Sequence, residues 1–181
     1  GNTIQVRDNV ASSIYRGIDI TGGTSNPVED CLVSNNMVYT PSGAGIWAGA
    51  LGQVTRNCKV SDNTIYGANA AASGTASAIT LRNATGFTVQ DNKVRGSAHV
   101  YALLEETGAN TNHWLDNDVD AGTSGTVTLV GAASTCRLAT TIQSLGGVML
   151  QDTLTLADDA TGTFRVRGAN QRGIFLISSN F

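Results

Sequence analysis

Charged residues are scarce in this chain. Of its 181 residues, 14% are Asp, Glu, Lys or Arg, well below the roughly 25% of a typical globular chain. Only two are lysines, and the formal net charge is −3. A surface that binds a phosphate backbone needs a concentration of cations, which this composition does not supply. We therefore expect no nucleic-acid partner.

Long apolar runs and paired cysteines are also missing. No apolar stretch reaches the roughly 18 residues that a membrane-spanning helix needs, so we expect no membrane span. The three cysteines, Cys31, Cys58 and Cys136, are an odd number without close spacing. They predict neither a zinc motif nor the disulfide framework of a small secreted domain. We interpret them as core residues and expect neither a metal nor a cofactor.

What the chain does contain is a short phrase that occurs five times, always with Asn at its fourth place. The copies are VRDNVA (6–11), VSNNMV (33–38), VSDNTI (60–65), VQDNKV (89–94) and WLDNDV (114–119). The fourth-place residues are Asn9, Asn36, Asn63, Asn92 and Asn117, at successive separations of 27, 27, 29 and 25 residues. A nearly constant period of this length indicates a repeat architecture, with one structural unit in each copy.

A second set of strand-like runs lies between the phrases. These runs are GIDIT (17–21), GIWAG (45–49), AITL (78–81), YALLE (101–105) and TVTLV (126–130). There are only two prolines and no helical periodicity, so both sets predict short strands joined by turns. One Asn-marked strand per period favours an all-β solenoid over a sandwich of hairpins. Another kind of all-β solenoid or a jelly roll is the alternative.

The phrase resembles the repeats of right-handed parallel β-helix proteins, the pectate-lyase-like superfamily, over about residues 1–136. This resemblance implies coils of about three short strands in which like residues stack on like. Asn tolerates the left-handed backbone of a sharp turn, and stacked Asn side chains can form a hydrogen-bonded ladder. Beside the ladder, we interpret Asp8, Asp62, Asp91 and Asp116 as a column of turn-capping acids.

Two interior columns follow from the same register. One contains Ile4, Cys31, Cys58 and Phe87, and the next contains Val6, Val33, Val60 and Val89, because alternate residues of a strand face the same side. In the fifth copy Asn112 and Trp114 stand at these places. That departure predicts an irregular or capping last coil.

The repeat pattern ends after Cys136. We expect a connector over 137–147 and a short antiparallel β segment over 148–181, because runs such as 153–156 and 163–167 alternate between polar and apolar residues. About three strands cannot bury a core of their own. This segment therefore needs either the remainder of a larger sandwich or further copies of itself. Because Gly1 falls in mid-pattern, without an initiator Met or a signal-like segment, we also expect an excised piece or a processed product.

The order of the parts, a β-helix followed by a small β module, resembles bacteriophage and prophage tailspike and tail fibre proteins. The resemblance implies a homotrimer that attaches to bacterial surface polysaccharide, together with other tail proteins, in the virion tail outside the cell. A secreted protein is the alternative location. A polysaccharide-degrading enzyme, either a lyase or a glycosidase, and a purely structural fibre module are the alternative functions.

Alternation in the second strand set predicts a surface column. If Ile18, Ile20, Ile46, Ala48, Ile79 and Leu81 point inward, then Asp19, Trp47 and Thr80 point outward. In the next coil, placing Val100, Ala102 and Leu104 inward leaves Tyr101, Leu103 and Glu105 exposed. Aromatic rings and carboxylates in one column are typical of a saccharide groove. The carbohydrate-binding candidates are Trp47, Tyr101, Asp19 and Thr80; in the alternative, Trp47 and Leu103 lie in a subunit interface or beneath the loop 66–76.

Catalytic residues are less evident. The candidates are Asp19, Glu105 and Glu106. Glycoside hydrolysis uses two carboxyl groups about 5 to 9.5 Å apart, whereas Asp19 and Glu105 are expected three coils apart, about 14 Å at the usual strand spacing. Glu105 and Glu106 are neighbours and face opposite sides of a strand. Arg82 has no acid cluster of the kind that a calcium-dependent lyase needs, and His99 and His113 are expected in turns or at the surface, so catalysis stays open.

Overall fold

The computed structural model describes residues 5–7, 10–12, 15–22, 27–71 and 74–138, with 5–7 and 10–12 described by their backbone alone. All regular secondary structure in these ranges is β-strand. No helix among them is long and apolar enough to cross a membrane. The predicted positions of Ile4, Asp8 and Asn9, most of the connector 137–147 and the β segment 148–181 lie outside the described residues.

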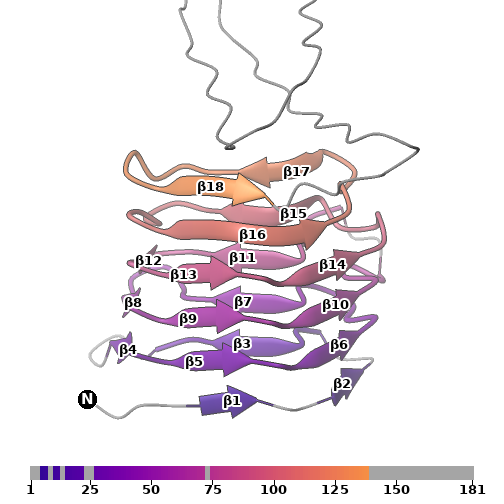
Figure 1. Cartoon of the computed structure of the whole chain (residues 1–181), viewed down its shortest axis with the longest axis horizontal. Coiled ribbons are helices and arrows are strands. Elements are labelled where there is room, and N and C mark those ends of the chain that lie inside the picture. Colours follow the sequence, from indigo (N-terminus) through magenta and orange to yellow (C-terminus); the bar gives the residue numbers. More distant parts are fainter. Residues whose placement is uncertain (1–4, 8–9, 13–14, 23–26, 72–73, 139–181) are drawn as a thin grey trace, which may run out of the picture. The chain divides into compact units, whose positions relative to one another are not determined.

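The strands form stacked parallel sheets, which we call A, B, C and D (Figure 1). Sheet A contains β1 (Gln5–Arg7), β5 (Leu32–Ser34), β9 (Lys59–Ser61), β13 (Thr88–Gln90), β16 (His113–Val119) and β18 (Thr135–Leu138). Sheet B contains β2 (Val10–Ser12), β6 (Met37–Tyr39), β10 (Thr64–Tyr66) and β14 (Lys93–Arg95), and joins sheet A through β16. Sheet C contains β3 (Ile18–Ile20), β7 (Ile46–Ala48), β11 (Ile79–Leu81), β15 (Tyr101–Glu105) and β17 (Gly125–Thr128), and sheet D contains β4 (Val28–Glu29), β8 (Thr55–Arg56) and β12 (Ala84–Thr85).

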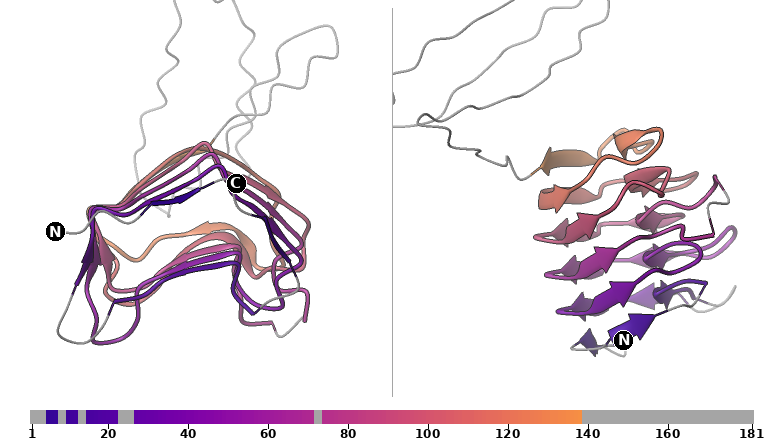
Figure 2. Two further views of the ribbon diagram at one scale, coloured as in Figure 1. Left: turned by 90° about the horizontal axis from the view of Figure 1, so that it is seen from below. Right: turned by 90° about the vertical axis from the view of Figure 1, so that its right-hand side faces the viewer.

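The first three coils pass through the sheets in the order A, B, C and D, and the fourth and fifth coils follow the same path without a sheet D strand. Each coil lies directly above the one before it (Figure 2). The strands of sheet A pair in parallel without a shift from β1 to β13, so that Val6, Val33, Val60 and Val89 are aligned. The predicted parallel β-helix is therefore confirmed. The coil differs from the expected three strands only by the two-residue strand in sheet D.

At the corner between sheets A and B, one residue adopts the left-handed backbone conformation and the next one, the repeated Asn, forms the ladder. Asn35, Asp62, Asp91 and Asp116 have positive φ angles of 56°, 58°, 53° and 52°. The prediction that the repeated Asn takes the left-handed conformation is therefore wrong; the residue before it does. Asn and Asp are the residues other than Gly that adopt this conformation most readily, because their short polar side chains bond to the local backbone.

The Asn ladder is confirmed over the four copies whose side chains are described. Asn63 Oδ1 accepts hydrogen bonds from the backbone N of Asn36 at 3.0 Å and from its Nδ2 at 2.9 Å. Asn92 accepts the same pair from Asn63, at 3.1 and 2.9 Å, and Asn117 accepts it from Asn92, at 3.0 and 2.9 Å. All four side chains are buried, so each ladder bond also satisfies a corner amide that water cannot reach.

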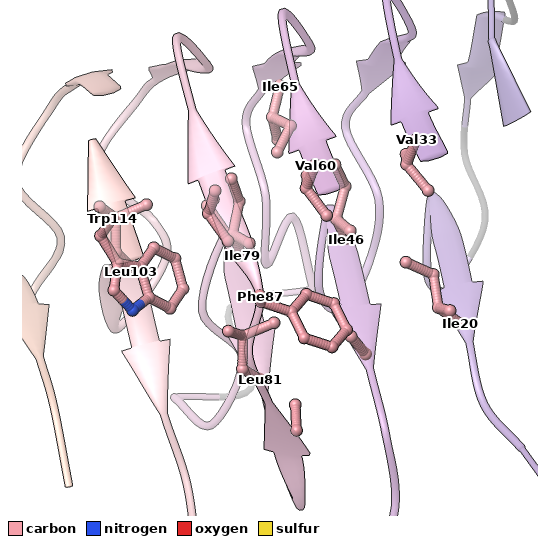
Figure 3. Packing of buried hydrophobic residues seen from close by; sticks show 14 of the residues in the cluster. Ile20, Val33, Ile46, Val60, Ile65, Ile79, Leu81, Phe87, Leu103 and Trp114 are labelled. Atoms are coloured by element: carbon pink, nitrogen blue, oxygen red, sulfur yellow. The ribbon is translucent and has the colours of Figure 1, made fainter. Parts of the chain in front are cut away.

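The two predicted interior columns are present as well, and Figure 3 shows several of their members between the stacked strands. Cys31, Cys58 and Phe87 are buried, as are Val33, Val60 and Val89. Burial raises the pKa of the Cys58 thiol to about 12, which agrees with a core role. Cys136 aligns with Trp114 but is exposed, because no described coil lies above β18.

The fifth copy of the phrase continues these columns rather than breaking them. Trp114 aligns with Val89 and is fully buried. Asn112 lies above Phe87, and its Oδ1 accepts a hydrogen bond from the Phe87 backbone N at 2.9 Å. The coil is regular at these two places, because a larger side chain and a buried amide both fit the columns. The expected irregularity lies further along β16, whose pairing with β18 shifts register between Leu115 and Asn117.

Small residues close the bend between sheets B and C. A Cβ atom on Gly45 would lie 2.6 Å from Ile65 Cγ2 and 2.9 Å from the Ala78 carbonyl oxygen. Distances this short are repulsive, so glycine is required where the chain turns from one sheet into the next. The outer face of sheet C begins just after this bend.

Candidate functional site

The outer face of sheet C carries the column predicted from alternation. Asp19, Trp47, Thr80 and Leu104 follow one another at the same place in β3, β7, β11 and β15. Asp19 is exposed and Trp47 is half-buried. Thr80 has no exposed surface, and its Oγ1 has no hydrogen-bond partner. The predicted exposure of Thr80 is therefore wrong, although its place in the column is as expected.

Trp47 is held in a fixed orientation by groups from two coils. Its Nε1 donates a hydrogen bond to the Gly49 carbonyl oxygen at 2.6 Å. The guanidinium carbon of Arg16 lies 4.1 Å from the centre of the indole ring, which is within cation–π distance. Arg16 also donates to Asp19 Oδ2 at 2.6 Å. The ring, the cation and the carboxylate therefore form one connected cluster.

Tyr15 extends this cluster to the open surface. The Arg16 guanidinium lies 5.6 Å from the Tyr15 ring centre, and Tyr15 is 69% exposed. We call Tyr15, Arg16, Asp19 and Trp47 the sheet C patch. Sequence reasoning missed Tyr15 and Arg16 because they precede the strand. The short separation in sequence between Arg16 and Asp19, which are three residues apart and of opposite charge, could have indicated this ion pair.

From Leu103 onward the register of β15 differs from the prediction by one residue, whereas Ala102 is buried as expected. Leu103 aligns with Ile79 and Glu105 with Leu81, so both side chains point inward and are buried, while Leu104 is the outward residue. The predicted exposure of Leu103 and Glu105 is therefore wrong. A shift of one residue exchanges the two faces of a strand. Leu103 takes the inward place because it extends the core column above Ile79.

Tyr101 lies outside the Trp47 column. It stands three residues before Leu104, and its backbone N donates to Ser77 Oγ at 3.1 Å. Its half-buried ring lies beside the backbone of Gly125, in the coil above, with ring carbons 3.5 and 3.6 Å from the place of a Cβ there. The structure therefore brings Asp19 and Trp47 together but leaves Tyr101 two coils away from Trp47.

Glu105 is surrounded by hydrogen-bond donors inside the solenoid. One carboxylate oxygen accepts from Asn112 Nδ2 at 2.9 Å and from Trp114 Nε1 at 3.0 Å. The other accepts from the backbone N atoms of Val130 and Gly131 at 3.3 and 3.1 Å. A carboxylate with this set of neutral donors stabilises the fold by joining three segments of the chain.

The other two acidic candidates are paired with arginines. Glu106 Oε2 lies 3.4 Å from Arg82 Nε, and Asp19 bonds Arg16 and Thr21 Oγ1. The part of the chain that the structure describes holds no group of three or more His, Cys, Asp or Glu placed to bind a metal. The three catalytic candidates therefore occupy three separate environments: Glu105 lies among buried donors, Glu106 beside Arg82, and Asp19 beside Arg16.

The two histidines occupy the two kinds of position that were expected. His99 lies in a bend and is fully buried, with Nε2 3.1 Å from the Asp120 carbonyl oxygen. His113 is exposed, and its Nδ1 lies 2.9 Å from Thr135 Oγ1. Among the described residues, neither histidine is hydrogen-bonded to a carboxylate, and both are distant in the chain from the sheet C patch.

Parallel coils, an Asn ladder and left-handed corners define the chain as a parallel β-solenoid protein. More particularly, the family model described as "right handed beta helix region" matches residues 1–139, and the chain belongs to that family. The fold expected from the repeated phrase and its pectate-lyase-like resemblance is thereby confirmed. No curated protein and no solved structure matches the chain significantly.

Proposed function

We propose that this β-helix is part of a virus-derived tail spike or tail fibre and attaches to bacterial surface polysaccharide through the sheet C patch. The observation that carries the proposal is the connected cluster of Trp47, Arg16, Asp19 and Tyr15 on the outer face of the solenoid. Aromatic rings bind the apolar faces of sugars, and charged groups bind their hydroxyls.

The patch is arranged before any ligand arrives. Trp47 is fixed by its hydrogen bond to Gly49 and by the Arg16 guanidinium, and Arg16 is fixed by Asp19. Side chains that are already ordered lose little conformational entropy when they bind. This favours a rigid attachment surface.

Binding is favoured over cleavage by the separation of the carboxylates. Glu105 is buried among neutral donors, and Glu106 is paired with Arg82 in the same part of the solenoid. Asp19 lies in the first coil, with β7 and β11 between β3 and β15. A glycosidase needs two carboxyl groups within reach of one glycosidic bond, and neither Glu105 nor Glu106 lies in a coil next to that of Asp19.

The tail proteins that the sequence resembles imply the remaining parts of the proposal. The chain would act as a homotrimer, with other tail proteins, in the virion tail outside the cell. Three copies of a weak saccharide surface on one rod gain avidity, because the second and third binding events become intramolecular.

An array of purified bacterial O-antigens and capsular polysaccharides tests the proposal. We expect the wild-type chain to be retained on at least one polysaccharide and Trp47→Ala to reduce that retention by about tenfold or more, as removal of a central aromatic contact does. His113→Ala, on the outer face of sheet A, serves as the control and should bind as the wild type does. Tyr101→Ala decides whether the surface extends to the fourth coil.

Two results would contradict the proposal. Retention of the wild type on none of the polysaccharides would exclude an attachment role, and unchanged retention of Trp47→Ala would exclude the sheet C patch. Shortening of a retained polysaccharide would instead establish cleavage and favour the enzyme alternative.

A further inference from the structure

The outer face of sheet B carries a second aromatic surface. Val38, Ile65 and Val94 are fully buried and point inward, so the residues on either side of them in β6, β10 and β14 point outward. The strand register places Tyr39, Tyr66 and Arg95 in one outward column, and Met37, Thr64 and Lys93 in the other. We call these six residues, with Asp118 and Asp120 of the next coil, the sheet B surface.

Tyr39 and Tyr66 are stacked face to face. Their ring centres are 5.1 Å apart and their planes differ by 6°. Both side chains are only half-buried. In the coil below, Ser12 aligns with Tyr39, so no aromatic residue continues the column there. The stack therefore ends at Tyr39 and presents aromatic surface at the outside of the solenoid.

Above the tyrosines, the column continues with charged groups that are held in place. Arg95 donates to the carboxylate of Asp118 and, at 3.0 Å, to its carbonyl oxygen, and it lies 3.7 Å from Asp120 Oδ1. The carboxylates of Asp118 and Asp120 remain 42% and 49% exposed. Lys93, aligned with Asp118, is exposed. Two cations and two anions balance one another.

We propose that the sheet B surface is a second binding surface for the same polysaccharide, a neutral polyhydroxylated chain that lies along the stack of coils. This inference rests on the proposed function. The tyrosine rings would contact apolar sugar faces, and the exposed carboxylates and the Lys93 ammonium would bond hydroxyl groups. Balanced charge favours a neutral saccharide over an anionic one, since an anion would meet Asp118 and Asp120.

The repeat of the coils suits a polymer. Successive coils are separated by about 4.8 Å, which is close to the length of one pyranose ring. A chain parallel to the axis therefore meets Tyr39, Tyr66, Arg95 and then the two aspartates in successive coils. Because this surface belongs to a different sheet from the sheet C patch, each polypeptide would carry two separate contacts, which raises avidity.

The same polysaccharide array tests the inference with variants of sheet B. We expect Tyr39→Ala/Tyr66→Ala to reduce retention by about tenfold, while Tyr39→Phe/Tyr66→Phe, which keeps both rings, retains most of the binding. Lys93→Ala removes an exposed side chain without altering the core and should weaken retention several-fold on neutral polysaccharides. Far-UV circular dichroism and light scattering would accompany each variant.

The outcomes separate this inference from the proposed function. If the tyrosine and Lys93 variants bind as the wild type does while Trp47→Ala loses binding, the sheet B surface is excluded and the proposed function stands. The reverse result supports sheet B and excludes the sheet C patch. A wild type that binds no polysaccharide overturns both. A changed molar mass in the tyrosine variants would identify the face as a protein interface and would also overturn the inference.

Discussion

At the residue scale, Glu105 shows how the interior of a β-helix can use a carboxylate. The side chain is 1% exposed and accepts hydrogen bonds from Trp114 of β16, from Asn112 just before that strand, and from two backbone amides after β17. Hydrogen bonds to a charged group contribute more than neutral ones, at about 1.5 to 3 kcal/mol each. Glu105 therefore ties the fourth coil to the fifth.

Glu105→Gln should destabilise the solenoid by about 2 to 3 kcal/mol. The substitution replaces one of the two accepting oxygens by an NH₂ group, so that two of the four buried donors around Glu105 lose their acceptor. Urea unfolding followed by circular dichroism would measure the change. Glu106→Gln is the matched control, and loss of its partly exposed pair with Arg82 should change the free energy of unfolding by less than about 1 kcal/mol. Equal effects of the two substitutions would refute the joining role of Glu105.

At the scale of the element, the corner between sheets A and B is built from two adjacent residues with different duties. The first adopts the left-handed backbone and is exposed in coils two to four, as at Asp62. The second, as at Asn63, is buried and joins three neighbouring coils, since Nδ2 also donates to the Val33 carbonyl oxygen at 3.0 Å. The corner thus combines a local backbone requirement with a long-range hydrogen bond.

Asn63→Ala should lower the free energy of unfolding by about 2 to 3 kcal/mol, because the buried backbone N of Asn36 loses its acceptor and the ladder is interrupted. Asp62→Asn, one residue earlier, keeps a side chain that tolerates the left-handed backbone and should change stability by less than about 0.5 kcal/mol. Chemical denaturation of both variants checks this. A larger loss in Asp62→Asn would show that the acid itself stabilises the corner.

At the scale of the whole molecule, stability comes from repeated contacts between neighbouring coils. From the second coil to the fifth, the ladder Asn residues and the buried residues of the two interior columns contact those of the neighbouring coil. In such quasi-one-dimensional architectures, the free energy of each interface adds to that of its neighbours. A solenoid of this kind can display the same face at several heights, which suits the proposed attachment role.

The proposed homotrimer predicts a threefold molar mass in light scattering. We expect the mass to fall to that of one chain when residues 148–181 are removed, because a short β segment cannot bury a core alone and needs partner copies. Retention of the circular dichroism spectrum in the shortened chain would show that the solenoid survives. A single-chain mass for the full protein would exclude the trimer and favour a secreted single-chain β-helix.

Much of the fold could be predicted because its repeat appears directly in the sequence, as short motifs at a nearly constant spacing. The spacing of the Asn residues and the column of Val33, Val60 and Val89 follow from the repeated phrase, and the strands of sheet C follow from the apolar runs between its copies. The site was predicted less well. Trp47 and Asp19 share a column as expected, but Tyr15 and Arg16 lie in a connection, where alternation makes no prediction, and the stack of Tyr39 on Tyr66 was overlooked although both occupy the place after the phrase.

The sequence by itself determined the repeat, the parallel coils and the identity of the residues that stack, since identical positions in consecutive coils must lie above one another. Only the tertiary structure decided which way β15 faces, because YALLE has apolar residues on both faces. Packing of Leu103 above Ile79 and the donors around Glu105 resolved that choice. The tertiary structure likewise decided which side chains remain exposed, since burial depends on contacts between segments distant in the chain.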